Sequence, residues 1–222
     1  MINKIMNQNI KDFVEELKQR PEVLGIILFG SWARGDNRPD SDVDLVVILT
    51  EGYKRTVEYK NDQAFEIIYT TEQSALEFWK NKIDDCAGLW SVAKILYDKN
   101  KTLNTLKEQA LEIIKNGKKP IDEYQKKQYQ FSAEDEIKAV EHLIANDPTT
   151  ANMVLAYTVN NLSSLFFDLR QLWTPAPKQR FSKIKEINPK LYSIFGRFYT
   201  DKTSLKEKIG VAKEIVPIVF EN

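Results

Sequence analysis

The chain is poor in the residues that build disulfide frameworks and histidine-based sites. Its 222 residues include one cysteine, Cys86, and one histidine, His142. A single cysteine excludes an internal disulfide and is typical of a reducing compartment. A single histidine gives no support to a histidine-based metal site or to a Ser-His-Asp triad. We therefore expect any catalytic chemistry to depend on other side chains.

Long apolar runs and a net charge are also missing. No apolar stretch approaches the roughly 20 residues that cross a bilayer, and the N-terminal residues mix charged with apolar side chains, unlike a signal peptide. Lysine and arginine together number 32, as do aspartate and glutamate. No overall field favours nucleic acid, and no basic stripe or series of stacking aromatics is present. We expect a globular, cytoplasmic protein that contacts neither a membrane nor nucleic acid.

One short region carries a recognisable pattern. Residues 30–35 read Gly-Ser-Trp-Ala-Arg-Gly, and the triplet Asp-Val-Asp at 42–44 follows a polar spacer. The Gly-Ser turn comes directly after an apolar run at 24–29, and the acidic triplet opens a second run at 45–49. Both runs are predicted to be buried strands. Backbone N–H groups at such a turn, where a helix begins, can bind phosphate oxygens.

The two aspartates of the triplet are placed to share a metal ion. Alternate residues of a strand point to the same face, so Asp42 and Asp44 should lie about 6–7 Å apart on one side of the sheet. Mg²⁺ in proteins is held by one or two carboxylates together with water and substrate phosphates. Each aspartate alone would be interpreted as a turn or strand-edge residue. Together, beside the Gly-Ser turn, they indicate a site for metal and triphosphate.

This pattern, the Gly-Ser turn, the spacer and Ser-Asp-Val-Asp-Leu, resembles the signature of the polymerase-β nucleotidyltransferase superfamily. That superfamily includes the small-molecule (antibiotic) nucleotidyltransferases and the minimal nucleotidyltransferases. The resemblance implies an enzyme that moves a nucleoside monophosphate, AMP from ATP in the first instance, onto an acceptor and releases pyrophosphate. It implies that Asp42 and Asp44 hold two Mg²⁺ ions. It also implies that Gly30, Ser31 and Ser41 bind the nucleotide.

The same resemblance implies a third carboxylate on a neighbouring strand. Two β-rich runs flank Asn61 and Asp62, which predicts a hairpin. Glu66 lies among apolar residues of the second run, where an acid is costly unless it binds metal or is paired. Glu66 is therefore the predicted third residue, either as a metal ligand or as the base that takes the acceptor proton. Glu58 is the alternative, and Asp62 is interpreted as a turn residue.

The predicted elements give an α+β fold with two domains. Strands and helices alternate over residues 1–100, whereas residues 101–222 contain only helical patterns. The helices are predicted at 103–115, 121–145, 149–173, 189–199 and 204–220. A small mixed-sheet domain followed by a helical bundle is similar to the antibiotic nucleotidyltransferases. That similarity implies that the helical half helps to bind the acceptor, and that Lys178 and Arg180, in a loop predicted after the long third helix, bind the triphosphate. A solvated basic loop is the alternative.

Three functional hypotheses follow from these observations. The first is an adenylyltransferase-like enzyme that acts on a hydroxyl of a small molecule, such as an aminoglycoside-type antibiotic. The second is an antitoxin-like transferase that modifies a protein. The third is a nucleotide-binding module without catalysis, against which the intact Asp42–Asp44 pair argues. The acceptor, the preferred nucleotide and the oligomeric state, with a dimer as one option, stay open.

Overall fold

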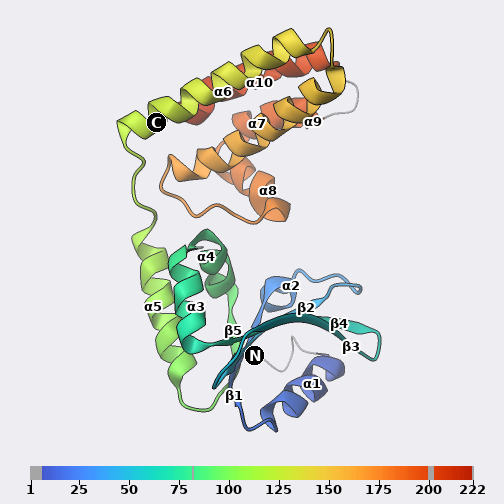
Figure 1. Cartoon of the computed structure of the whole chain (residues 1–222), viewed down its shortest axis with the longest axis vertical. Helices are drawn as coiled ribbons and strands as arrows, with labels where there is room; N and C mark the ends of the chain where they lie inside the picture. Colours follow the sequence, from blue (N-terminus) through green and yellow to red (C-terminus); the bar gives the residue numbers. More distant parts are fainter. Residues whose placement is uncertain (1–6, 82, 200–202, 222) are drawn as a thin grey trace. The chain divides into compact units, whose positions relative to one another are not determined.

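The computed structural model describes residues 7–81, 83–199 and 203–221, and it divides the chain into two compact units (Figure 1). The first unit is Met1–Asn116 and the second is Gly117–Asn222. The first combines a sheet with helices, and the second is helical throughout its described residues. The predicted α+β class is confirmed.

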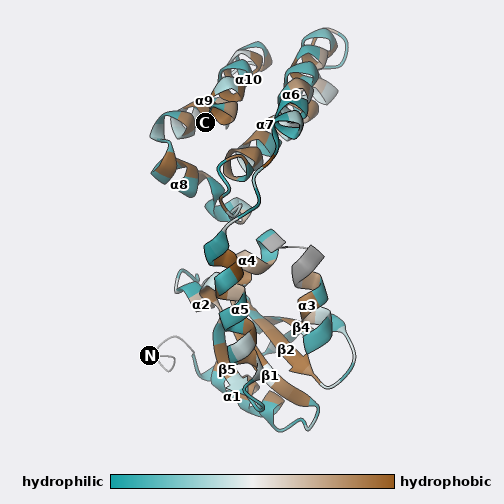
Figure 2. Cartoon of the chain, turned by 90° about the vertical axis from the view of Figure 1, so that its left-hand side faces the viewer, coloured by the Kyte–Doolittle hydropathy of each residue, from teal (hydrophilic) through white to brown (hydrophobic). Residues whose placement is uncertain are grey.

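The first unit is built on a five-stranded mixed sheet. Its strands are β1 (Val23–Phe29), β2 (Val43–Leu49), β3 (Lys54–Lys60), β4 (Gln63–Thr71) and β5 (Lys94–Asp98). Their order across the sheet is β3-β4-β2-β1-β5. β2 and β4 run parallel, and the other neighbouring pairs run antiparallel. Hydrophobic residues fill β1 and β2 (Figure 2), as expected for central strands covered on both faces.

Helices cover both faces of this sheet. Helix α1 (Gln8–Lys18) packs on one face through the side chains of Ile10, Phe13, Val14 and Leu17, whose spacing predicted a helix. Helices α3 (Glu72–Asn81), α4 (Ile83–Val92) and α5 (Thr102–Asn116) lie on the other face (Figure 1). The short helix α2 (Gly30–Arg34) connects β1 with the loop that leads to β2.

The division of the chain lies after Asn116, whereas the sequence prediction put it after residue 100. The reason is α5, of which Leu103, Leu106 and Ala110 are buried in the core of the first unit. Leu103 lies against Gly25 of β1, where an added Cβ would come within 2.4 Å of its side chain. A helical pattern in sequence does not show which core a helix joins, so α5 was assigned to the second half.

The second unit consists of α6 (Glu123–Leu143), α7 (Pro148–Asp168), α8 (Pro177–Ile187), α9 (Pro189–Tyr199) and α10 (Leu205–Phe220) around one apolar core. The predicted capping box at the start of α10 is confirmed, with reciprocal bonds between Ser204 and Glu207. No helix among the described residues is both long enough and apolar enough to span a membrane.

One predicted loop is wrong. Helix α7 ends at Asp168 rather than at residue 173, because Gln171 adopts φ 56°, which a right-handed helix does not accommodate. Helix α8 then begins at Pro177, a position where the missing N–H of proline costs nothing. Lys178 and Arg180 therefore lie near the start of a helix and not in a proline-rich loop.

Candidate active site

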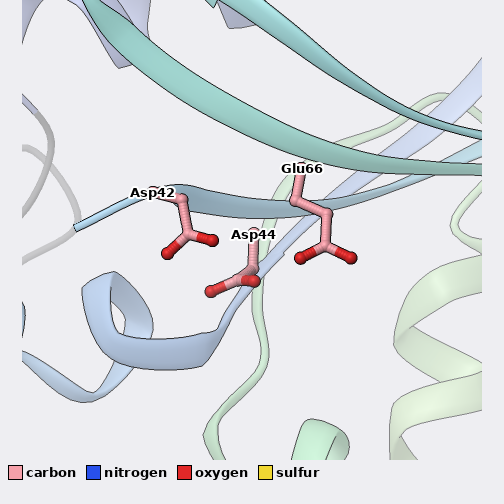
Figure 3. A group of neighbouring side chains, drawn as sticks. All are labelled: Asp42, Asp44 and Glu66. Atoms are coloured by element: carbon pink, nitrogen blue, oxygen red, sulfur yellow. The ribbon is translucent and has the colours of Figure 1, made fainter.

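The register of the sheet brings three acidic side chains together. Asp42 directly precedes β2, Asp44 is in β2, and Asp44 pairs with Glu66 of the parallel strand β4. Each of the three offers a carboxylate oxygen within 4.8 Å of those of the other two. Figure 3 shows all three carboxylates pointing to the same side of the sheet. Asp42 is exposed, whereas Asp44 and Glu66 are half-buried.

The alternatives for the third carboxylate lie elsewhere. Glu58 pairs across the strands with Phe65, so its side chain is on the face opposite to that of Glu66. There it accepts a hydrogen bond from the Tyr69 hydroxyl at 3.3 Å. Asn61 and Asp62 form the hairpin turn with φ of 48° and 63°, as the sequence predicted. Of these candidates, Glu66 is the one that joins the aspartates.

Gly30 makes the close packing at Asp44 possible. Its φ is +65°, and an added Cβ would lie 1.8 Å from Oδ2 of Asp44. Any other residue would therefore be strained in its backbone and would displace the carboxylate. The sequence placed Gly30 in a phosphate-binding turn. The structure adds a steric reason that pattern analysis did not find.

Ser31 follows Gly30 at the start of α2 and is half-buried. Its carbonyl oxygen accepts the backbone N–H of Gly35 at 2.8 Å, which closes the single turn of α2. Gly35 ends that turn in the left-handed region, with φ 86°. The N–H groups of the first turn of a helix have no partner within the helix. The predicted phosphate-binding turn is thus a genuine helix start beside Asp44.

The loop that ends at Asp42 is held in place through Ser41. The Ser41 carbonyl oxygen accepts hydrogen bonds from Nε1 of Trp32 at 3.3 Å and from Nε2 of Gln63 at 2.8 Å. The Ser41 hydroxyl oxygen accepts the backbone N–H of Arg38 at 2.9 Å. These three bonds fix the chain one residue before Asp42. Sequence analysis missed Trp32 and Gln63, because no local pattern links them to Ser41.

Besides lying next to the two aspartates, Glu66 forms an ion pair with Arg55. Arg55 of β3 donates from Nε to Oε1 of Glu66 at 2.8 Å, and its Nη2 donates to the same oxygen. The Arg55 side chain is 63% exposed and that of Glu66 is 27% exposed. The hydrogen bonds and the charge of Glu66 raise the pKa of Arg55. Sequence analysis did not single out Arg55.

Two predicted nucleotide-binding residues, Lys178 and Arg180, belong to the other unit. Lys178 is exposed at the start of α8. Arg180 donates from Nη1 to Oδ1 of Asn160 at 3.4 Å and to Oγ of Ser163 at 3.3 Å, so it joins α8 to α7. The role of both residues in binding the triphosphate stays a prediction.

The donor set fits a hard divalent cation. Three carboxylates supply only oxygen ligands, which Mg²⁺ and Mn²⁺ prefer to nitrogen or sulfur. Carboxylates whose oxygens lie within 4.8 Å of one another repel when no cation lies between them. Cys86, by contrast, is buried, and this burial raises the pKa of its thiol to about 11. A thiol in that state is a poor nucleophile, so Cys86 is a core residue.

Comparisons with known proteins agree with this geometry. Residues 10–98 match the family model described as "Nucleotidyltransferase domain". A protein of Methanocaldococcus jannaschii named "Putative protein adenylyltransferase" is 30% identical over 146 residues, which take in 60% of this chain and 98% of that protein. A second protein of that organism with the same description is 49% identical over 41 residues, or 18% of this chain and 41% of that protein.

A solved structure resembles the chain over almost its whole length. It is the crystal structure of a nucleotidyltransferase-like protein from Exiguobacterium sibiricum, with a TM-score of 0.53 and 16% sequence identity. The similarity covers 96% of this chain and 73% of that one. At this identity the likeness concerns the fold alone: a mixed-sheet unit followed by helices.

Proposed function

The chain belongs to the nucleotidyltransferase family and is an adenylyltransferase-like enzyme. We propose that it transfers AMP from ATP onto a hydroxyl group of a partner protein. The proposed reaction depends on a divalent metal and releases pyrophosphate. The observation that carries the metal-dependent chemistry is the group of Asp42, Asp44 and Glu66 on one face of the sheet. It lies beside the glycine turn that opens α2. We also propose that the protein works in the reducing cytoplasm, where Cys86 stays a thiol.

The proposal assigns tasks to the residues of this site, with two options for Glu66. Asp42 and Asp44 hold one or two Mg²⁺ ions, and Glu66 either joins them as a ligand or acts as the base. When bound, the metal neutralises charge on the triphosphate and on the pyrophosphate that leaves. The backbone N–H groups of Gly30 and Ser31 bind phosphate oxygens at the start of α2. As in phosphoryl transfer generally, positioning and electrostatic stabilisation supply most of the rate.

Glu66 has two candidate tasks: it completes the metal site, or it takes the proton from the acceptor hydroxyl. Replacing Glu66 with glutamine separates them. If Glu66 is a ligand, the variant needs more Mg²⁺ to reach its maximal rate. If it is the base, the rate at saturating Mg²⁺ falls and its pH dependence changes, while the requirement for Mg²⁺ stays close to that of the parent.

The acceptor is assigned from the relatives. Both Methanocaldococcus jannaschii proteins carry a name that specifies a protein as the acceptor. A small-molecule hydroxyl, such as that of an aminoglycoside-type antibiotic, is the second candidate. It is favoured by the order of the two units, because a mixed-sheet unit followed by a helical unit, here Gly117–Asn222, is similar to the antibiotic nucleotidyltransferases. In either case Lys178 and Arg180 are proposed to bind the triphosphate.

The test uses ATP labelled at either end of the triphosphate. The purified protein is incubated with Mg²⁺ and with α-labelled or γ-labelled ATP, in the presence of a cell extract or of aminoglycosides and lincosamides. Adenylylation transfers the α-label and releases the γ-label in pyrophosphate. α-Label on protein supports the first acceptor, and α-label on a drug supports the second. Asp44→Asn is the inactive control. Transfer of the γ-label that the parent causes and Asp44→Asn does not would contradict nucleotidyl transfer altogether.

A further inference from the structure

The ion pair at Glu66 lies on the face of the metal group. In the β3–β4 register, Val57 is opposite Glu66 and Arg55 is opposite Ile68, so Arg55 and Glu66 share one face as diagonal neighbours. Both Arg55 donors end on a single oxygen, Oε1. The charge of Asp44 also contributes to the raised pKa of Arg55. The guanidinium is therefore within electrostatic range of two residues of the acidic group.

Two features favour exchange of this pair for another partner. Arg55 comes from the edge strand and is 63% exposed, and pairs between side chains so open to water contribute little to stability. The backbone of Glu66 is held by the pairing of β4 with β2 and so does not depend on Arg55 for its position. A divalent cation among three carboxylates interacts more strongly, because it has twice the charge and three partners.

We propose that Arg55 competes with the divalent cation for Glu66. Arg55 neutralises part of the acidic group when no metal is bound, and its positive charge opposes metal entry. Two cations beside one carboxylate repel each other, so binding of the metal weakens the Arg55–Glu66 pair. Arg55 therefore raises the concentration of Mg²⁺ at which the site fills. This inference rests on the proposed function, since the cation is the one that the reaction uses.

An alternative role for Arg55, orienting Glu66, makes the opposite prediction. If Arg55 served to orient Glu66 as a ligand, its removal would leave Glu66 free to rotate and would weaken metal binding. The sign of the change on replacing Arg55 therefore separates competition from orientation. A replacement by glutamine keeps hydrogen-bonding groups and removes the charge.

The experiment measures Mn²⁺ binding to the full chain without nucleotide, from the electron paramagnetic resonance signal of the free ion. Mn²⁺ is the probe because it prefers the same oxygen ligands as Mg²⁺. Arg55→Gln is compared with Lys54→Gln, which removes a neighbouring charge of β3 on the opposite face. We expect Arg55→Gln to bind Mn²⁺ about two- to fivefold more tightly than the parent, from the usual strength of exposed pairs. Lys54→Gln should change the affinity less.

A double-mutant cycle with Glu66→Gln completes the test. In that background Arg55 has no Glu66 carboxylate to compete for, so Arg55→Gln should tighten Mn²⁺ binding clearly less than it does in the parent, by no more than the general repulsion between its charge and the cation. An equal or weaker affinity of Arg55→Gln in the parent background overturns the inference, and so does the same tightening without Glu66. Failure of the proposed metal site is distinguishable from both, because then the parent itself would bind no Mn²⁺ and Asp44→Asn would change nothing.

Discussion

Two groups of charged side chains, one in each unit of the chain, serve opposite purposes. In the second unit, the guanidinium of Arg170 donates to the backbone carbonyl oxygens of Phe166, Ile218, Val219 and Glu221. Lys118 is likewise bonded to Asp168 and Thr174. Arg170 thus satisfies backbone carbonyl groups near the end of α10, and Lys118 pairs with a carboxylate, so both charges stabilise the fold.

In the first unit, three carboxylates of the same sign are gathered at Asp42, Asp44 and Glu66. This arrangement costs free energy in the metal-free protein, and the left-handed backbone at Gly30 is needed to accommodate it. A group that the fold tolerates without benefit to its own stability is best explained by what it binds. The comparison predicts that substitutions in the acidic group of the first unit change activity and that substitution of Arg170 in the second unit changes stability.

The largest effect is expected at the acidic group. Asp44→Asn or Asp42→Asn should lower transfer of AMP by about a hundredfold or more, comparable to the loss of other catalytic electrostatic contacts. Thermal stability without metal should be unchanged or higher, because repulsion is relieved. Asp40→Asn is the matched control, since Asp40 is paired with Arg38 in the same loop. Label transfer and melting temperature are measured together. If both variants turned over at nearly the parental rate, the acidic group would not be required for the reaction.

Two glycines separate backbone strain from damage to the site. Gly30→Ala and Gly35→Ala both place alanine at a positive φ, which should cost each about 1–2 kcal/mol in the free energy of unfolding. Only the Cβ at position 30 meets Asp44, because nothing lies within 4 Å at position 35. Gly30→Ala should therefore lose most of its transfer activity and Gly35→Ala should keep it. Equal activity of the two variants, measured per folded molecule, would show that the contact with Asp44 is unimportant.

In the second unit the main effect should be on stability. Arg170→Ala leaves backbone carbonyl groups near the end of α10 without their donor, and we expect a loss of roughly 2–4 kcal/mol in urea unfolding. Lys213→Ala, which breaks the exposed pair with Glu141, should cost less than about 1 kcal/mol. The transfer rate of the folded Arg170→Ala protein should match that of the parent. If this rate fell as it does in Asp44→Asn, the separation between the units would not hold.

A smaller effect tests whether the second unit contributes to nucleotide binding. Lys178→Ala should weaken the binding of ATP by about tenfold, the loss of one charge-assisted hydrogen bond, with less change for AMP. Lys190→Ala, an exposed lysine at the start of the next helix, is the control. Calorimetric titration with each nucleotide gives both affinities. Arg180→Ala is informative only beside a stability measurement, because Arg180 also binds Asn160 and Ser163. Equal ATP affinities in the two lysine variants would show that Lys178 is a solvated surface residue that does not bind the triphosphate.

The smallest effect concerns Cys86 and is absent at neutral pH. Burial raises the pKa of its thiol to about 11 in the folded protein, so the unfolded chain loses this proton at a lower pH. The stability that this group contributes is complete below the unfolded pKa and is lost as the pH rises towards 11. The unfolding free energy of the parent, relative to that of Cys86→Ala, should therefore fall by roughly 1–2 kcal/mol over that alkaline range. A constant difference would mean that Cys86 is less buried than described.

Local features of this protein are determined by the sequence alone. The strand periodicity of residues 42–49 places Asp42 and Asp44 on one face, and the hairpin at Asn61 and Asp62 follows from turn chemistry. The capping box at Ser204 and the glycine turn at Gly30 were also predictable. Each depends on backbone geometry within a few residues, which the side-chain types themselves specify.

Other features were decided only by the tertiary structure. The sequence predicted Glu66 but left Glu58 as an alternative, and the parallel register of β2 and β4 decides between them by placing Glu66 beside Asp44. The β3–β4 register places Arg55 on Glu66, which the sequence did not predict. The bond from Gln63 to Ser41 and the burial of α5 in the first unit are of the same kind. These contacts depend on which strands and helices become neighbours. The free energy of the whole packed core determines which elements are neighbours, and a local sequence pattern does not specify them.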